Sequence, residues 1–288
     1  MIAITGATGH LGLATIQALL PKVGASEIIA VVRDPQKAAS VLPQGIPMRA
    51  GDYNDPAALL AAFQGVATVV LISTSELEYD ARIRQHQNVI DAAKEANVHH
   101  VVYISGLNPS MDSFFSTSLS HVVTEEYLRK SGLTYTIVRN TLYLDIIPML
   151  VGEGTLLSGK LYAAVGEGKV CYGLREEMAQ ALANMLTSEG HENQVYDIAP
   201  GPAYSMQDIA TTLSEVTGQP VVYVAILPED LAATMRQHQV PEPFITLTVG
   251  MSTAMKNNEF NTPSATFEQL LGRKPTDLKT YLASVYKK

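Results

Sequence analysis

The chain has 288 residues, 47% hydrophobic and 17% charged, which is the balance of a folded protein and excludes a disordered one. Its 20 Lys and Arg stand against 28 Asp and Glu, a net charge of -8 without any basic run, so we expect no nucleic-acid partner. The single cysteine, Cys171, excludes an internal disulfide and a thiolate metal site and is expected to be a small buried residue.

The start of the chain already has the pattern of a strand, from Met1 to Thr5, so a signal peptide is not expected. No apolar run approaches the roughly 20 residues that span a bilayer. We therefore predict a cytoplasmic protein without membrane contact, either a monomer or a homodimer.

Short apolar runs alternate with helical stretches through the first 140 residues. The runs are rich in Val and Ile and apolar on both faces, which is typical of buried parallel strands. We predict strands at residues 2–5, 28–32, 46–49, 68–72, 100–104 and 134–138, and helices at 11–20, 35–41, 56–63, 80–96 and 119–131. This order predicts an α/β fold of the Rossmann type, a doubly wound parallel sheet with right-handed crossovers.

The pattern changes after residue 150. Glycines between positions 152 and 168 predict a loop-rich stretch without a helix. Helices are predicted again at 176–187 and 206–217, strands at 195–199 and 221–225, and a mostly helical tail from residue 228. We predict a dinucleotide-binding domain over residues 1–150. A smaller α/β lobe over 151–288, interleaved with the first and packed on it, should roof the cleft above the sheet.

A glycine-rich segment follows the first predicted strand directly and opens a helix: Gly6, Ala7, Thr8, Gly9, His10, Leu11 and Gly12. Gly6 permits a tight turn, Gly9 lets the backbone approach a diphosphate, and Gly12 lets the helix pack close to the strand. The free N–H groups at the helix start favour the negative charges of such a group. The segment therefore predicts a dinucleotide site.

The end of the second strand indicates which dinucleotide binds. NAD sites usually carry an acidic residue there, which accepts from the ribose 2′-hydroxyl. Here Arg33 occupies the position, and a guanidinium suits a 2′-phosphate. Asp34 follows and could accept from a 2′-hydroxyl instead. We predict NADPH, with NADH as the alternative.

Three small hydroxyl residues, Ser73, Thr74 and Ser75, end the fourth strand, where ligands of such sheets bind.

The catalytic residues of ordinary short-chain dehydrogenases are incomplete. Tyr127 has its lysine at Lys130, one residue short of the Tyr-x-x-x-Lys spacing, although Ser105 ends the fifth strand as the serine of such enzymes does. His121 and Glu125 stand at i and i+4, where a carboxylate could orient an imidazole facing the ligand, although a surface pair fits the spacing equally. We see no metal site.

The sequence resembles the NmrA-like branch of atypical short-chain dehydrogenases, and within it the NADPH-dependent quinone oxidoreductases and the triphenylmethane-dye reductases. The resemblance rests on residues 4–12, 31–37, 51–53, 132–143, 189–193 and 240–244 and spans essentially the whole chain. It implies direct hydride transfer, without flavin, to a quinone or a similar electrophilic aromatic acceptor.

The resemblance also implies site residues. Cofactor contacts fall on Gly6 to Gly12, Arg33, Ser73 to Ser75, Val138, Arg139, Asn140 and Tyr143, with His121 and Tyr143 as candidates for catalysis. His121 stands where related plant reductases keep a lysine, which leaves its role as proton donor open. The alternatives are a non-enzymatic NADP(H)-sensing regulator of the same branch and, third, a sugar-nucleotide epimerase.

Overall fold

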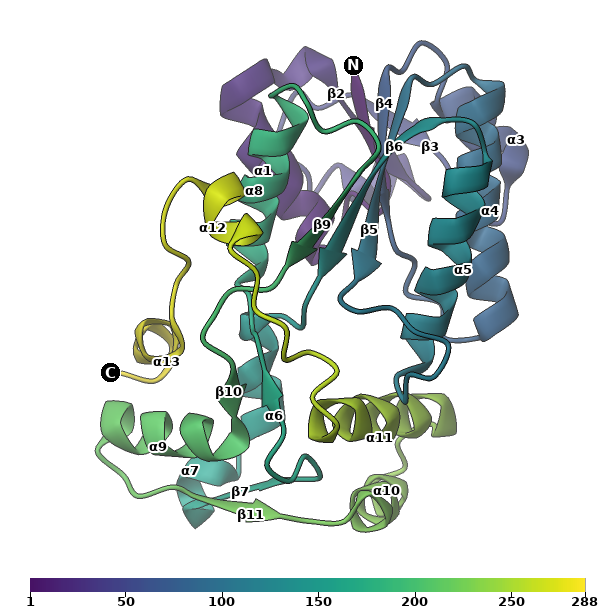
Figure 1. Ribbon diagram of the computed structural model, residues 1–288. Coiled ribbons are helices and arrows are strands. Elements are labelled where there is room, and N and C mark those ends of the chain that lie inside the picture. The colour runs from purple at the N-terminus through teal and green to yellow at the C-terminus, as the bar shows by residue number, and fades with distance from the viewer. Residues whose placement is uncertain (288) are drawn as a thin grey trace.

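A seven-stranded parallel sheet forms the centre of the computed structural model, which describes residues 1–287 (Figure 1). The strands are ordered β3-β2-β1-β4-β5-β6-β9. Their bounds are β1 Ile2–Ile4, β2 Ile28–Val32, β3 Met48–Ala50, β4 Thr68–Ile72, β5 His100–Gly106, β6 Thr134–Asn140 and β9 Gln194–Ile198. The order reverses direction at β1 and β4, which opens a crevice between their carboxyl ends. The predicted Rossmann-type sheet is confirmed.

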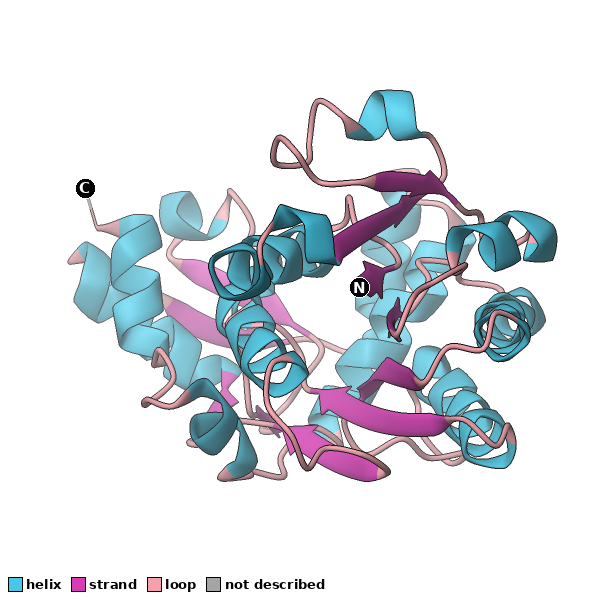
Figure 2. Ribbon diagram, turned by 90° about the horizontal axis from the view of Figure 1, so that it is seen from above, coloured by secondary structure: helices cyan, strands magenta, loops and turns pink. Residues whose placement is uncertain are grey.

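Helices cover both faces of this sheet (Figures 1 and 2). One layer contains α1 (His10–Val23), α8 (Arg175–Leu186) and α12 (Thr266–Leu271). The opposite layer contains α3 (Pro56–Ala62), α4 (Tyr79–Glu95) and α5 (Ser116–Lys130), while the short α2 (Pro35–Ala38) connects β2 to β3.

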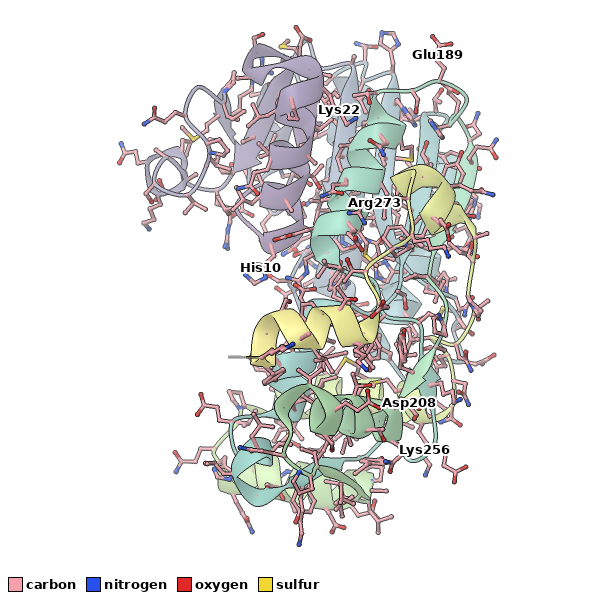
Figure 3. All side chains as sticks on the ribbon, turned by 90° about the vertical axis from the view of Figure 1, so that its left-hand side faces the viewer. His10, Lys22, Glu189, Asp208, Lys256 and Arg273 are labelled. Atoms are coloured by element: carbon pink, nitrogen blue, oxygen red, sulfur yellow. The ribbon has the colours of Figure 1, made fainter. Side chains whose placement is uncertain are left out.

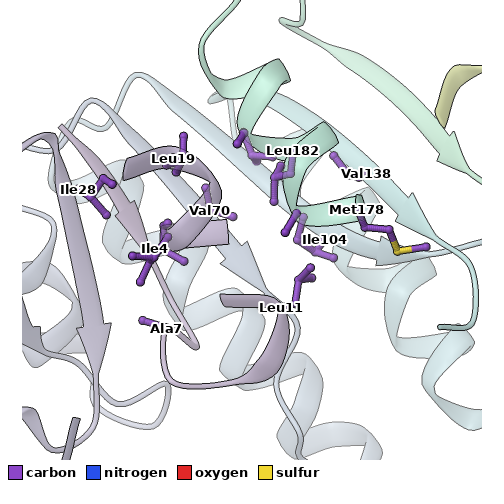
Figure 4. Packing of buried hydrophobic residues seen from close by; sticks show 14 of the residues in the cluster. Ile4, Ala7, Leu11, Leu19, Ile28, Val70, Ile104, Val138, Met178 and Leu182 are labelled. Atoms are coloured by element: carbon purple, nitrogen blue, oxygen red, sulfur yellow. The ribbon is translucent and has the colours of Figure 1, made fainter. Parts of the chain in front are cut away.

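Successive strand residues point to opposite helix layers, so each face has its own core. Ile4, Val70 and Ile104 pack against α1 and α8, where Leu11, Leu19, Met178 and Leu182 meet them (Figure 4). Their strand neighbours Ala3, Val69 and Tyr103 pack on the α3–α5 side. Burial on both faces explains why these strands read as continuous apolar runs.

A second lobe lies beyond the carboxyl ends of the strands (Figure 1). It contains two small sheets, antiparallel β8–β10 and parallel β7–β11. Its elements are η2 Leu144–Ile146, α6 Ile147–Val151, α7 Thr155–Ser158, β7 Lys160–Ala163, β8 Lys169–Val170, β10 Tyr204–Ser205, α9 Met206–Thr217, β11 Val222–Ala225, α10 Pro228–Gln237, α11 Glu242–Lys256 and α13 Leu278–Tyr286. None of the helices within residues 1–287 has the length and hydropathy to cross a membrane.

The expectation of a helix-free loop over 152–168 is wrong. The segment contains the single turn α7, which ends at Gly159 with φ +69, and the strand β7. β7 pairs with β11 through Lys160 and Val222, a partner far along the chain that a local glycine pattern does not reveal.

The second half of the chain contributes to both lobes. β9 extends the large sheet beside β6, and α8 packs along α1. The chain therefore returns to the sheet after it has begun the second lobe at η2 and α6.

Candidate functional site

The glycine-rich turn leads directly from β1 into α1. Gly6 has φ +60, a conformation that side chains disfavour, and Gly9 is the N-cap of α1 without a side-chain cap. A Cβ on Gly12 would lie 2.3 Å from the Gly6 carbonyl oxygen, so only glycine fits there. The turn thus presents bare backbone and a helix N-terminus, which together fit a diphosphate.

The turn forms one wall of a cleft of about 290 Å³ at the carboxyl edge of the sheet. The residues that line it come from the ends of four strands: Gly6 to Gly9, Val31 to Arg33, Gly51 to Asn54, Ile72 to Ser75, and Gln85 of α4. The structure therefore brings together the predicted residues Gly6, Ala7, Thr8, Gly9, Arg33, Ser73, Thr74 and Ser75. His10, Leu11 and Gly12 lie in α1 behind this wall.

Arg33 is exposed at the end of β2 and lines the cleft. Asp34 instead caps α2, because its carboxylate accepts from the backbone N–H groups of Gln36 and Lys37 at 3.1 and 3.2 Å. Lys37 also reaches that carboxylate at 3.3 Å. Arg33 is therefore the residue of this pair that is free to contact a 2′-phosphate.

The Ser73–Ser75 segment is held from behind by buried polar groups. Ser73 Oγ donates to the Ile104 carbonyl at 2.6 Å, and the Thr74 N–H donates to His86 Nε2 at 3.1 Å. Arg82, which is 6% exposed, donates to the Thr74 carbonyl at 2.5 Å and to Ser120 Oγ at 2.8 Å. This wall of the cleft is therefore fixed before any ligand arrives.

The same buried layer contains two histidines that stay neutral. Burial, reinforced by the charge of Arg82, lowers the pKa of His86 to about 3. Burial also lowers the pKa of His121 well below its usual range, again with Arg82 as the next cause. Burial raises the pKa of Tyr103 to about 12, so this phenol keeps its proton.

His121 does not pair with Glu125. Its Nδ1 lies 2.6 Å from the Tyr103 hydroxyl, and the two neutral groups share one hydrogen bond whose direction follows from the imidazole tautomer. The imidazole also packs against Gly106, where a Cβ would lie 3.0 Å from its Cδ2.

Glu125 is instead the centre of a buried ion cluster. Its carboxylate accepts from Arg139 at 2.9 and 2.7 Å, from Ser105 at 2.7 Å and from Arg129 at 2.9 Å. Burial by itself would raise the pKa of Glu125, but the bonds from Arg139 and Ser105 hold it below its usual value. The i,i+4 spacing predicted a His121–Glu125 pair. Glu125 binds Arg139 instead, because Arg139 reaches it from a strand distant in the sequence and carries a full positive charge.

The residues at the end of β6 divide between the two faces of the sheet. Val138 packs in the core with α1 and α8, and Asn140, two residues further, shares its face. Arg139 points to the opposite face, where Glu125 holds it, so its guanidinium is engaged away from the lined cleft. Tyr143 lies beyond the strand, and its ring is stacked under Arg175 with 4.3 Å between Cζ and the ring centroid.

Tyr127 has no place in the site. Its hydroxyl donates to Asp91 at 2.7 Å on the outer face of α5, and Lys130 pairs with Glu126 at 2.5 Å. Ser105 faces Glu125 and not the cleft. The region of the cleft therefore lacks the tyrosine–lysine pair of ordinary short-chain dehydrogenases.

A second cavity of about 560 Å³ continues from the cleft and shares Arg33, Asn54, Thr74, Ser75 and Gln85 with it. Its far wall is the start of α11, where Pro243 and Phe244 approach the sheet half of the molecule. Asn54, Gln85 and Arg175 lie outside the motifs that predict the site from the sequence. Asn54 and Gln85 show no motif of their own, and Arg175 is recognisable only by its place at the start of α8.

Known proteins share this architecture. The model of the NmrA-like family matches residues 1–282. Quinone oxidoreductase 2 of Escherichia coli (strain K12) is 35% identical, with 99% of each chain covered. NAD(P)H azoreductase of Xenophilus azovorans is 29% identical, covering 84% of this chain and 82% of its own. The structure of Citrobacter sp. triphenylmethane reductase complexed with NADP(H) is 37% identical, with a TM-score of 0.92 over 99% of this chain and 100% of that one.

Proposed function

The chain belongs to the NmrA-like family, and from this premise we propose that it transfers hydride from NADPH directly to a quinone or a similar electrophilic aromatic acceptor, without a flavin. That the chain is an NADPH-dependent oxidoreductase rests on its relatives and on the cofactor cradle. The acceptor class and the roles of individual residues are the parts proposed.

One observation carries the acceptor class: the cleft is lined by the glycine-rich turn and Arg33, yet Tyr127 and Lys130 are engaged on an outer surface. A simple ketone needs an acid to protonate its oxygen as hydride arrives, whereas a quinone or an aromatic cation is already electrophilic. The site fits an acceptor of the second kind.

In this proposal, the residues of the chain bind NADPH and position the acceptor beside it. The N-terminus of α1, reached through the glycine-rich turn, offers backbone N–H groups to a diphosphate, and Arg33 offers a guanidinium to a 2′-phosphate. NADPH, when bound, supplies the hydride. The acceptor is proposed to lie between the Ser73–Ser75 segment, Tyr143 and the second lobe; the second cavity, between Ser75 and the start of α11, supports this place.

His121 has a limited role in this proposal. Because its ring is neutral, the imidazole has a single N–H donor and no surplus proton. It can donate a hydrogen bond, but it is not an imidazolium acid. The reduced acceptor then takes its proton from water.

Turnover tests the proposal. Purified protein, checked for the absence of flavin absorbance, is mixed with NADPH and a small quinone, an azo dye, a triphenylmethane dye or a simple ketone. Nicotinamide absorbance should fall with at least one aromatic acceptor and not with the ketone. NADPH deuterated at the transferred position should slow a hydride-limited step. Tight NADPH binding without turnover of any acceptor would support an NADP-sensing regulator instead.

A further inference from the structure

We propose that Arg82 is a positioning residue whose buried positive charge raises the specificity of the site for acceptors that become anions, relative to acceptors that start as cations. The inference rests on the proposed function, because it takes the second cavity as the place of the acceptor. It adds a preference between neutral and cationic acceptors.

The Arg82 side chain lies directly behind the wall of the second cavity. It comes from the start of α4 and is 6% exposed. Nη1 donates to the backbone carbonyl oxygens of Thr74 at 2.5 Å and Glu76 at 3.2 Å, and both of these residues line the cavity. One layer of backbone therefore separates the guanidinium from the space proposed for the acceptor.

The charge of this guanidinium has no carboxylate partner. Its acceptors are the two carbonyl oxygens and Ser120 Oγ, 2.8 Å from Nε, all of them neutral groups. None of the ion pairs within residues 1–287 includes Arg82. Buried charges are normally paired, because their removal from water is costly. An unpaired one behind the wall of a cavity indicates that its charge acts on what the cavity holds.

Four titratable side chains near Arg82 carry no charge. Burial, reinforced by Arg82 itself, lowers the pKa of His86 to about 3 and the pKa of His121 well below its usual range. Burial raises the pKa of Tyr103 to about 12 and also raises the pKa of Tyr53. None of these groups opposes the charge of Arg82.

The carboxylates nearby oppose it only weakly. Glu125, in the same buried layer, is already paired with Arg139. Glu76 and Glu78 line the second cavity, but Glu76 is partly exposed, Glu78 is exposed, and both carboxylates accept from backbone N–H groups around the start of α4. Water screens an exposed charge far more than a buried one, so we infer that Arg82 gives the cavity a positive field.

This field acts differently on two kinds of acceptor. A hydride brings the electron pair of the broken C–H bond, so a neutral quinone becomes an anion and later takes a proton from water, whereas a cationic triphenylmethane dye becomes neutral. Measured from the free acceptor, a positive field stabilises the transition state of the quinone and repels that of the dye. The charge of the quinone appears only after binding and affects kcat, while the dye is repelled on binding, which affects KM.

The ratio of kcat/KM for a small neutral quinone to kcat/KM for a cationic triphenylmethane dye tests the assignment at saturating NADPH. Arg82→Met should lower this ratio about 10-fold, with a lower kcat for the quinone and a lower KM for the dye. Arg82→Lys should keep the ratio within about threefold of the unmodified protein, since it retains the charge without the fork. A disturbed wall alone would lower both values and leave the ratio unchanged.

Dye binding gives a second readout that needs no turnover. With NADP⁺ in place of NADPH no hydride is available, and absorbance titration measures the affinity of each acceptor. Relative to the neutral quinone, Arg82→Met should bind the cationic dye about 3- to 10-fold more tightly than the unmodified protein does. Should Arg82→Met not fold, Arg82→Gln decides by the same two comparisons.

Arg84→Met and Arg273→Met are the matched controls. Arg84 is exposed on α4, two residues from Arg82. Arg273 lies beside α8 and α12, on the opposite face of the sheet from α4 (Figure 3), and its side chain is 50% exposed. Because water screens both charges, both variants should keep the ratio and the dye affinity of the unmodified protein.

The outcomes are separable. An unchanged ratio with an unchanged relative dye affinity in folded Arg82→Met overturns the assignment, as does a ratio in Arg82→Lys as low as in Arg82→Met. An unmodified protein that reduces neither acceptor contradicts the proposed function instead, and the dye titration then decides whether the charge of Arg82 acts on the cavity.

Discussion

Arg33 and Asp34 show how adjacent charges acquire different roles. Asp34 could accept from a ribose 2′-hydroxyl, and Arg33 could bind a 2′-phosphate. The carboxylate of Asp34 caps α2, however, whereas Arg33 is exposed and lines the cleft. The hydrogen bonds of the cap decide which of them can contact the cofactor.

Arg33→Ala should narrow the preference for NADPH over NADH. A guanidinium–phosphate pair contributes about 2–3 kcal/mol, so NADPH affinity should fall roughly 30- to 150-fold while NADH affinity changes little. Fluorescence titration of both cofactors measures this. Lys37→Ala is the control, because Lys37 is a nearby exposed cation that pairs with Asp34. Equal binding of NADH and NADPH by the unmodified protein would show that Arg33 does not recognise a 2′-phosphate.

His121→Ala should lower kcat less than about tenfold, because the neutral imidazole gives at most one hydrogen bond. Between about pH 5.5 and 8, the pH profile of kcat of the unmodified protein should also contain no transition that disappears in His121→Ala. His99→Ala is the control, because it removes an imidazole that is exposed on the surface. A fall of about 10²–10⁴ would instead identify His121 as a general acid.

At the scale of elements, the β1–α1 turn combines two kinds of glycine. Gly9 faces open space, since a Cβ there would meet only the Gly6 carbonyl oxygen at 3.2 Å. Gly12 faces the backbone of the turn itself, with Ala7 Cα at 2.9 Å from its would-be Cβ. Gly12 therefore serves the packing of the turn, and we propose that Gly9 leaves room for the ligand.

Gly9→Val should therefore abolish NADPH binding while the unfolding midpoint stays close to that of the unmodified protein, since its side chain would occupy space that the diphosphate needs. Gly12→Ala should instead lower the free energy of unfolding by about 1–3 kcal/mol, because the turn must shift. Thermal unfolding and calorimetry separate the two effects. Unimpaired NADPH binding by folded Gly9→Val would place the diphosphate elsewhere.

For the molecule as a whole, the neutral buried histidines make stability depend on pH. The pKa of His86 is about 3 in the folded protein, against about 6.5 in the unfolded chain. As pH falls below about 6.5 the unfolded state takes up a proton that the folded state refuses, so stability falls. His121 acts in the same direction.

From pH 7 to pH 5, His86 alone should remove about 2 kcal/mol from the free energy of unfolding. Urea unfolding at the two pH values measures the loss, and His86→Gln should reduce it by about that amount. His238→Gln is the control, because that imidazole is exposed in the folded protein. An identical pH dependence in His86→Gln and the unmodified protein would contradict a neutral buried His86.

The sequence by itself determined the elements whose signals are local. Continuous Val and Ile runs place the strands, and the spacing of Gly6, Gly9 and Gly12 after the first of them places the tight turn into α1, because side-chain volume and backbone freedom act within a few residues. The family motifs extend this to the class of enzyme.

Only the tertiary structure decided what depends on distant partners. β7 pairs with β11 across the second lobe, and Glu125 binds Arg139 of β6 and not the histidine one turn away. Arg175 meets His10 only because α8 returns to pack beside α1. A charged or polar side chain takes whichever partner the fold brings within hydrogen-bond distance, and spacing along one helix cannot show a partner that arrives from another strand.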